Sequence, residues 1–319
     1  MTPRRLLPLA LLPGLCLVAA PKAVPFADLL HRCYEEYLTL YPIEAGINGD
    51  TDPRFQGMWP DDLSPAWRAR VQAWSRKYQA ELARVDKAKL SPSERLSYDS
   101  LRFSLRIREE ATRRPLHLLP INQIACETLT FAQMGSGAFI HPFKTEQDYR
   151  DFLGRAKGFS AWVDQALANM KEGMAKGIVP PRILMTRVLP QFADLMKPEA
   201  EGNILFDPLK TLPAGMDEAA KAKLSGDYRA GLNEVARPAY ARLHAFIQDV
   251  YLPACGPHSG LGALRGGPEA YRTLVRLQTT TDLTPDQIHA LGLREVARIQ
   301  GEMEAVKAKV GFQGTLPQF

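Results

Sequence analysis

Apolar residues recur every three or four positions along this 319-residue sequence, and no other feature constrains the fold as strongly. Such spacing aligns apolar side chains along one face of an α-helix. Two long stripes stand out, and stripes of this kind lie in a protein core far more often than against a cofactor. We therefore expect both to be buried. The first comprises Trp67, Val71, Trp74, Tyr78, Leu82 and Val85, and the second comprises Ile288, Leu291, Val296, Ile299, Met303, Val306 and Val310.

Three predicted helix starts share a signature, in which a hydroxyl residue precedes proline. It occurs at Ser64-Pro65, Ser91-Pro92 and Thr284-Pro285. The hydroxyl oxygen can accept a hydrogen bond from an otherwise unpaired N–H, and proline at the first helical position has no N–H to leave unpaired. Glu94 and Gln287 follow their hydroxyl residues at the third position, which predicts two capping boxes.

Other segments also favour helices, and little of the sequence favours strands. Leu116–Ile124 could form a short extended piece. Pro238 interrupts the longest predicted helix and should kink or break it. Ser91–Ala111 carries apolar residues on two faces, so we expect neighbouring helices on both sides of it. The remaining predicted helices are Phe26–Leu40, Gln147–Lys176, Arg182–Met196, Asp217–Val250 and Pro268–Gln278, and the connectors are Tyr41–Pro60, Pro115–Phe143 and Pro198–Gly215.

Together these elements predict an all-α fold of long, mostly antiparallel helices with Pro/Gly-rich connecting loops. The chain is 45% hydrophobic and 24% charged, which is a balance typical of globular proteins with a sizeable core. Its 25 prolines and 23 glycines are scattered, so wholesale disorder is not expected. We find no repeat of fixed period, which argues against a solenoid.

The first twenty residues have the layout of a secretory signal peptide. Arg4 and Arg5 form a basic start, and an apolar run from Leu6 to Ala20 ends in small residues. The run is shorter than the roughly 20 residues that a membrane-spanning helix needs, so no span is predicted. We expect export to the periplasm or the medium. Cleavage should follow residue 20, or a position as late as residue 23 because Pro21 hinders cutting before it.

Cys16 offers a second route of export, as a lipid-modified cysteine. A small residue normally precedes such a cysteine and Leu15 stands there, so the lipoprotein is the less favoured interpretation. Without the leader, the cysteines are Cys33, Cys126 and Cys255, an odd number that leaves at least one thiol free or paired between chains. One disulfide and three free thiols both stay open. The wide separation of the cysteines excludes C-x-x-C redox or zinc chemistry.

The charge pattern argues against nucleic-acid binding. Beyond the leader, 38 Lys and Arg residues face 35 Asp and Glu residues. The densest basic segment, from Arg106 to Arg114, is interrupted by Glu109 and Glu110. Nucleic-acid binding usually needs a concentrated basic face, so we expect no nucleic-acid partner.

No catalytic or metal-binding residue is predicted from local motifs. The six histidines include no H-E-x-x-H pair, which is the usual helical zinc motif. His31 and Glu35 lie one helical turn apart, but two ligands do not make a metal site, and we expect a solvated ion pair. Ser136 lies between two glycines, whereas Met134 and Ala138 stand where a nucleophile elbow needs glycine.

Two further patterns start a motif without completing it. Gly260-Leu261-Gly262 resembles the start of a dinucleotide fingerprint, but Arg265 replaces the third glycine and no strand precedes it, so we expect a turn. Glu302 and Glu304 lie two residues apart on a predicted helix and point in different directions, which excludes an acid–base pair.

The segment from Gly260 to Gly311 is similar to a known bacterial family. It contains a glycine-rich turn, Tyr271 in a short predicted helix, threonines at positions 279–281 and then LTPDQIHALGLREVARI. Members of the family called "domain of unknown function 885" carry a similar succession. Phe26–Asn48 also resembles the opening helix of that family, and Tyr149–Pro181 resembles a middle segment.

The resemblance implies a mostly helical fold similar to gluzincin-type zinc peptidases. In such proteins a later H-E-x-x-P-G-H-H-like motif would supply zinc ligands and a glutamate as general base. The zinc would activate water and polarise a peptide carbonyl. No residue of this sequence matches the motif, so the resemblance assigns no zinc ligand and no catalytic residue here. Zinc and a peptide substrate are expectations for a complete family member.

We expect residues 24–319 to be the helical N-terminal portion of an exported zinc metallopeptidase-like hydrolase, incomplete at its C-terminus and inactive as given. The alternative is a non-catalytic exported helical binding or scaffold protein. In a complete protein the Gly266-Gly267 turn could present Tyr271 or Arg272 to a substrate, although a plain turn with Tyr271 in the core is favoured. His289, near a helix start, is expected to be solvated.

Overall fold

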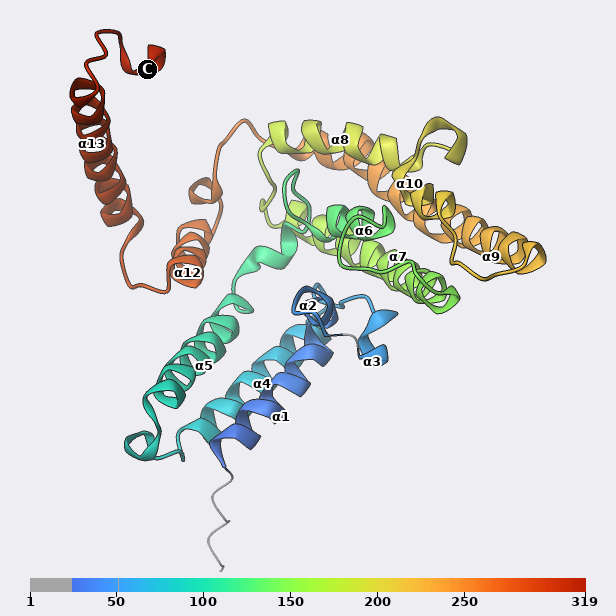
Figure 1. Ribbon diagram of the computed structural model, residues 1–319, viewed down its shortest axis with the longest axis horizontal. Helices are drawn as coiled ribbons and strands as arrows, with labels where there is room; N and C mark the ends of the chain where they lie inside the picture. The colour runs from blue at the N-terminus through green and yellow to red at the C-terminus, as the bar shows by residue number, and fades with distance from the viewer. Residues whose placement is uncertain (1–24, 51) are drawn as a thin grey trace, which may run out of the picture.

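The computed structural model describes residues 25–50 and 52–319, and every regular element in these ranges is helical (Figure 1). The predicted all-α class is confirmed. The predicted signal peptide, its cleavage site and Cys16 lie outside the described residues. Within the described ranges, no helix combines the length and apolar character needed to cross a bilayer.

Three N-terminal helices pack together: α1 (Phe26–Leu40), α4 (Pro65–Leu82) and α5 (Pro92–Ala111). Helices α1 and α4 run antiparallel, because Arg32 pairs with Glu81 whereas Glu36, later in α1, pairs with the earlier Lys77. Helix α5 returns along α4 in the same manner. Of the first predicted stripe, Val71, Trp74, Tyr78 and Leu82 are buried here as expected, and Trp67 and Val85 are half-buried. The shared core consists of Phe26, Leu29, Cys33, Leu40, Val71, Trp74, Tyr78, Leu82 and Leu105.

The predicted helix caps are confirmed. Oγ of Ser64 accepts a hydrogen bond from the Trp67 N–H at 3.0 Å. Ser91 and Glu94 form a complete capping box, as do Thr284 and Gln287. These local bonds fix where α4, α5 and α13 (Pro285–Lys309) begin.

Short helices occupy the segments that we predicted as connectors. The first contains α2 (Pro42–Ile47) and α3 (Pro53–Gln56), and the third contains the 3₁₀ turns η3 (Glu199–Glu201) and η4 (Ile204–Lys210). The second contains α6 (Glu127–Gly135), which the sequence did not reveal because Cys126 at its start provides no side-chain cap. The extended piece expected at Leu116–Ile124 is also wrong, since that stretch begins with the 3₁₀ turn η2 (Pro115–Leu118).

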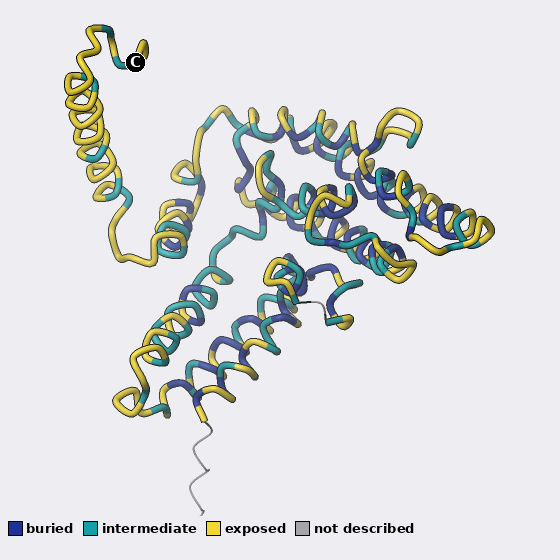
Figure 2. The backbone as a smooth tube through the Cα atoms, in the orientation of Figure 1, coloured by how far each residue is buried: buried dark blue, intermediate teal, exposed yellow. Residues whose placement is uncertain are grey.

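A second and larger core lies among the central helices (Figure 2). Helix α7 (Glu146–Ala175) runs through this core and buries eleven residues, among them Tyr149, Phe152, Phe159 and Trp162. The other elements of the central part are α6, α8 (Arg182–Met196), α9 (Glu218–Gly231), η5 (Leu232–Ala236), α10 (Arg237–Phe246), η6 (Ile247–Tyr251) and α11 (Leu252–Ala254).

Pro238 does not break the long helix. Residues Leu232–Ala236 form a π-helical turn just before it, and Arg237 keeps helical dihedral angles of −62° and −43°. Proline lacks the N–H of a regular α-helical bond and its ring crowds the preceding turn. A π turn is wider, because its hydrogen bonds join residues that are five apart, and it relieves both problems. A second π turn, Ile247–Tyr251, precedes Pro253 in the same way.

Helix α7 ties the N-terminal segment to the central core through the buried side chain of Arg155. Its guanidinium donates to three backbone carbonyls, those of Gln56 at 2.5 Å, Met58 at 3.2 Å and Phe55 at 3.3 Å. Only 1% of Arg155 is exposed. The three carbonyls satisfy the donors of a cation that would otherwise be buried without partners.

We expect Arg155→Met to lower the free energy of unfolding by about 2–4 kcal/mol, because three carbonyls lose a buried donor. Arg150→Met, on the same helix, removes an exposed ion pair with Glu146 and should change the free energy by less than about 0.5 kcal/mol. Urea unfolding followed by circular dichroism measures both. Equal losses in the two variants would contradict this role of Arg155.

Helix α12 (Gly267–Thr279) packs against the end of α5. Thr273 and Arg276 both donate to the carboxylate of Glu110, at 2.8 and 3.0 Å. The predicted position of α5 between neighbours is therefore right at this end. It is wrong at the start of α5, where Leu96 is 70% exposed.

Helix α13 contradicts the second predicted stripe. It stands apart from the two cores, and none of its residues is buried (Figures 1 and 2). Six of the seven side chains of the stripe are exposed, by fractions from 39% at Leu291 to 62% at Val310, and Ile288 is half-buried. Among the described elements it contacts mainly the turn η8 (Leu316–Gln318), which follows it. The stripe has helical spacing, but among the described residues only the short C-terminal segment around η8 and Phe319 lies against it. Spacing alone therefore predicted the helix correctly and its burial wrongly.

Candidate functional site

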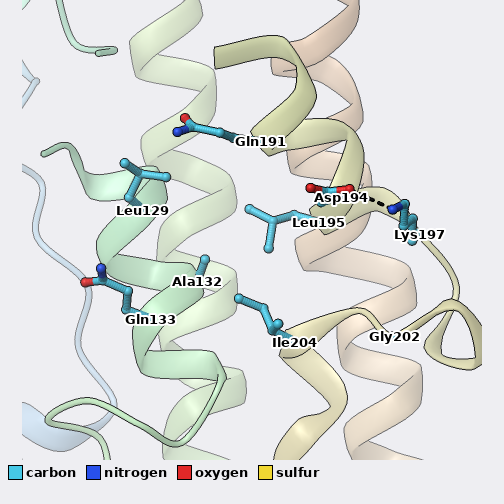
Figure 3. A pocket seen from close by; sticks show the side chains of 9 residues that line it. All are labelled: Leu129, Ala132, Gln133, Gln191, Asp194, Leu195, Lys197, Gly202 and Ile204. Carbon is cyan, nitrogen blue, oxygen red and sulfur yellow. Dashed lines mark ion pairs between the residues drawn. The ribbon is translucent and has the colours of Figure 1, made fainter. Parts of the chain in front are cut away.

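A groove of about 610 Å³ separates α6 from α8 and the segment that follows α8 (Figure 3). Leu195 and Ile204 point across it toward Ala132, and Leu129 and Gln191 lie at one end. Its size suits a small organic ligand. Its charges, however, cancel locally, because Lys197 pairs with Asp194 at 2.7 Å. The groove can bind but offers no group prepared for acid–base chemistry.

A smaller hollow of about 170 Å³ is lined by three acids from separate segments. Glu44 comes from α2, Asp62 from the loop before α4, and Glu127 from the first position of α6. We call this space the acidic hollow. Ile43 and Phe139 contribute apolar wall.

Helix α7 places Asp62 in the acidic hollow. Nε1 of Trp162 donates to Oδ1 of Asp62 at 2.6 Å. Two turns further along α7, Nδ2 of Asn169 donates to the carbonyls of Leu63 at 3.0 Å and His117 at 3.1 Å. Together with Arg155, these side chains hold both ends of the loop that carries Asp62.

Burial dominates the electrostatics of the acidic hollow. It raises the pKa of Glu127 to about 8, and the negative charges of Asp62 and Glu44 add to the effect. Burial likewise raises the pKa of Asp62, against the hydrogen bond from Trp162 that lowers it. Oε2 of Glu127 is inaccessible to solvent and has no hydrogen-bond partner. Enclosed acids with raised pKa values occur often at functional sites, which is why we identify this hollow as the candidate site.

A hollow of opposite character adjoins it. This space of about 280 Å³ shares Tyr41 and Asp62 with the acidic hollow, but its other polar walls include Arg68, Arg108 and Arg114. The guanidinium of Arg108 lies 4.9 Å from the centre of the Tyr41 ring. Negative side chains therefore line the acidic hollow, positive side chains line most of the adjoining one, and Tyr41 and Asp62 lie between the two.

The described residues do not fit a zinc ion. Between residues 25 and 50 and from 52 onward, no three His, Cys, Asp or Glu side chains are grouped closely enough to hold a metal. The three acids of the acidic hollow therefore do not form such a group either. The same ranges contain three free thiols, those of Cys33, Cys126 and Cys255. Of the two alternatives that the sequence left open, the structure therefore has free cysteines and not a disulfide.

The sequence motifs weighed above do not meet at one site. His31 is exposed, and Glu35 pairs with Arg54 at 2.8 Å, so the ion pair predicted between His31 and Glu35 is wrong. The glycines around Ser136 belong to a turn at the end of α6. Gly260 and Gly262 flank the start of a 3₁₀ turn, η7 (Leu261–Ala263), as the interpretation as a turn predicted.

Near the Gly266-Gly267 turn, the structure confirms the expected turn but not the expected burial of Tyr271. Gly266 has a left-handed φ of 71°, which confirms the turn and explains why glycine stands there. Tyr271 is 48% exposed and is not in the core. Arg272 pairs with Glu269 on the same helix at 2.9 Å, and His289 is exposed as expected.

A sequence profile described as "Bacterial protein of unknown function (DUF885)" matches residues 42–319. The chain belongs to this family. The resemblance drawn from the segment Gly260–Gly311 is thereby confirmed at the level of the family. No curated protein matches the chain.

Two solved structures share the fold of this DUF885 chain. One is "the putative lipoprotein from Colwellia psychrerythraea", with a TM-score of 0.76 and 16% identity over 92% of this chain and 52% of that one. The other is "a putative lipoprotein of unknown function from Shewanella oneidensis", with a TM-score of 0.59 and 18% identity over 90% of this chain and 48% of that one. The DUF885 chain thus spans about half the length of the two structures.

Sequence reasoning missed Asp62 and Glu127, and no sequence signal marks them. An acid in the first turn of a helix is ordinarily explained by the helix dipole. Asp62 lies beside Asp61, which is exposed, and nothing in the sequence distinguishes the two. Only the folded DUF885 chain shows that both side chains line one enclosed space.

The raised pKa of Glu127 makes a prediction about stability. The unfolded carboxyl has a pKa of about 4.3, so the folded state binds this proton more tightly. The resulting stabilisation is complete below the unfolded pKa and is lost as the pH rises through about 8. Glu127→Gln, which stays neutral, should unfold with nearly the parent free energy at pH 5 and be more stable at pH 9, by on the order of a few kcal/mol.

Urea unfolding at pH 5 and pH 9 measures this difference. Glu218→Gln is the matched control, because the Glu218 side chain is 90% exposed. The free energy of unfolding of this control should differ from that of the parent by the same amount at both pH values. A Glu127→Gln effect that does not grow with pH would show that Glu127 ionises normally in the folded chain.

Proposed function

We propose that the chain is the helical part of an exported, zinc metallopeptidase-like hydrolase, in which it supplies scaffold and one side of a substrate cleft. The zinc and its ligands would lie outside the residues that the structure describes, since the described residues do not fit the metal. The substrate would be a peptide. This proposal joins the family membership to the resemblance between the family and gluzincin-type peptidases.

The exposed stripe of α13 is the observation that supports the proposal most. Six apolar side chains of the stripe face solvent: Leu291, Val296, Ile299, Met303, Val306 and Val310. A soluble protein rarely exposes so continuous an apolar surface unless something covers it. The two solved structures with this fold are about twice as long as the part they share with this chain. Additional polypeptide of that size would provide the cover for α13.

Export is supported by the layout of the first twenty residues, with its basic start and apolar run. Both structural relatives are described as putative lipoproteins. Their descriptions support lipid attachment at Cys16 as much as secretion, although Leu15 precedes that cysteine. Either route would take the protein out of the cytoplasm.

A non-catalytic exported binding protein is the second candidate. The groove beside α8 favours it, because its 610 Å³ of space suits a ligand while its ion pair and amides offer no acid–base chemistry. In that case α13 would present its stripe to a separate partner protein.

We expect the 319-residue chain to bind the dye 8-anilinonaphthalene-1-sulfonate strongly, because α13 exposes its stripe. The double substitution Ile299→Lys and Val306→Lys should abolish most of this fluorescence without changing the helix content. A matched control, Gln300→Lys and Ala308→Lys, adds the same charge to α13 outside the stripe and should retain it. Weak fluorescence in the parent would contradict an uncovered stripe.

Peptide hydrolysis separates the two candidates. The complete product of the gene, with any sequence that continues this chain, should contain one zinc per molecule and cleave unstructured peptides until a chelator is added. The 319-residue chain alone should do neither. Chelator-sensitive cleavage by the 319-residue chain would place the chemistry within it, and a zinc-free, inactive gene product would favour the binding protein.

A further inference from the structure

The densest basic segment of the sequence contains a half-buried cation that the fold leaves without a carboxylate. In this segment Glu109 pairs with Arg113 at 2.6 Å, and Glu110 pairs with Arg114 at 2.8 Å. Arg108 is half-buried as well, yet it forms no ion pair with any residue that the structure describes. Burying a charge without a partner is unfavourable, so an anion beside Arg108 would be stabilised.

Two tyrosine rings hold the guanidinium of Arg108 in place. Its Cζ atom lies 4.9 Å from the ring centres of both Tyr37 and Tyr41. Nη2 donates to the hydroxyl of Tyr37 at 3.2 Å, and Nε donates to Oγ of Ser104 at 3.3 Å. Nη1 donates to no residue in the described ranges, and it stays open to solvent. The fixed guanidinium therefore keeps one donor that a ligand can reach.

Two more arginines line the same space of about 280 Å³, which we call the arginine hollow. Arg68 lies near the start of α4 and Arg114 just after α5, and the two ends meet because these helices run antiparallel. Nη1 of Arg68 donates to the carbonyl of Leu63 at 2.7 Å. Its Nε and Nη2 donate to no described residue and are likewise open to solvent.

The carboxylates nearby do not cancel this positive charge. Glu110 already pairs with two arginines, at 2.8 and 3.0 Å. Asp62 lines the arginine hollow, but its Oδ1 accepts from Trp162, and burial favours its neutral form by raising its pKa. Glu44 lines the acidic hollow and forms no ion pair with Arg108. Positive charge therefore prevails in the arginine hollow.

The remaining walls of the arginine hollow are largely apolar. They include Leu63, Trp67, Leu116 and, from α12, Leu277. The space is smaller than the roughly 300 Å³ at which pockets for drug-sized ligands begin, so it suits a smaller molecule. Apolar walls leave much of a multiply charged phosphate without hydrogen-bond partners, whereas they match an apolar body that carries a single anionic group.

We propose that the arginine hollow binds a small organic acid, in which one carboxylate is attached to a compact apolar or aromatic body. The carboxylate accepts hydrogen bonds from Nη1 of Arg108 and from the open nitrogens of Arg68. The body lies against Trp67 and Leu277. Guanidinium groups suit a carboxylate because they present N–H donors in a planar, fixed arrangement. The proposal concerns the described residues alone and is independent of whether the chain belongs to a hydrolase.

The test is a titration of the full chain with sodium phenylacetate at pH 7, followed by protein NMR. Phenylacetamide is the neutral probe of the same shape, and inorganic phosphate is an anion without an apolar body. We expect saturable binding of phenylacetate, which weakens as sodium chloride is added. The amide should bind at least about tenfold more weakly. Phosphate at an equal concentration should not displace phenylacetate.

Substitutions locate the binding site. Arg108→Gln removes the fixed guanidinium and should weaken binding about tenfold. Arg108→Lys keeps the charge without the planar fork of donors and should weaken binding about threefold. Arg68→Gln should weaken binding several-fold at a second position. Arg106→Gln is the matched control, because it removes one exposed charge from the same helix, and it should bind like the parent.

Circular dichroism shows whether each variant is folded, and Arg68→Gln keeps the test decisive if Arg108→Gln does not fold. Equal binding of phenylacetate by the parent and Arg68→Gln would overturn the proposal. Binding of phenylacetamide as tight as that of phenylacetate, or displacement by phosphate, would also overturn it. The same holds if Arg106→Gln weakens binding as much as Arg68→Gln, since only a general attraction to positive charge would then remain.

Discussion

The candidate site depends on polar side chains that α7 extends out of the central core. Arg155, Trp162 and Asn169 lie on one side of this helix, and all three donate to the segment between residues 55 and 63 or to its neighbour at His117. Arg155 and Asn169 bind backbone carbonyls, and burying those carbonyls without a hydrogen-bond donor would destabilise the fold. The loop that carries Asp62 is therefore fixed by hydrogen bonds rather than by regular structure of its own.

Local rules predicted most of the helices. The hydroxyl–proline starts fixed α4, α5 and α13, and the bounds of α1 and α8 agree with prediction to the residue. Helix α6 was missed because Cys126 gives no capping bond. The π turn before Pro238 was missed because it depends on how the surrounding helices pack, and proline alone indicates only that regular bonding must change.

The two apolar stripes show what periodicity can and cannot predict. The stripes of α4 and α13 have the same spacing, yet Val71 and Tyr78 are wholly buried whereas Val296 and Val306 are each 53% exposed. Spacing predicts that a helix has an apolar face. Burial also requires a partner surface, and this depends on the whole assembly. For the same reason no motif marked Glu127, whose character comes from neighbours that are distant in the sequence.

The acidic hollow has walls from α2, from the loop before α4 and from α6, so it joins the N-terminal helices to the central core. It exists only while these two groups of helices are docked. Any ligand that occupies it selects the docked arrangement and is bound more weakly by every other one. Occupancy of a space of about 170 Å³ would thus act as a clamp on the relative position of two large helical units.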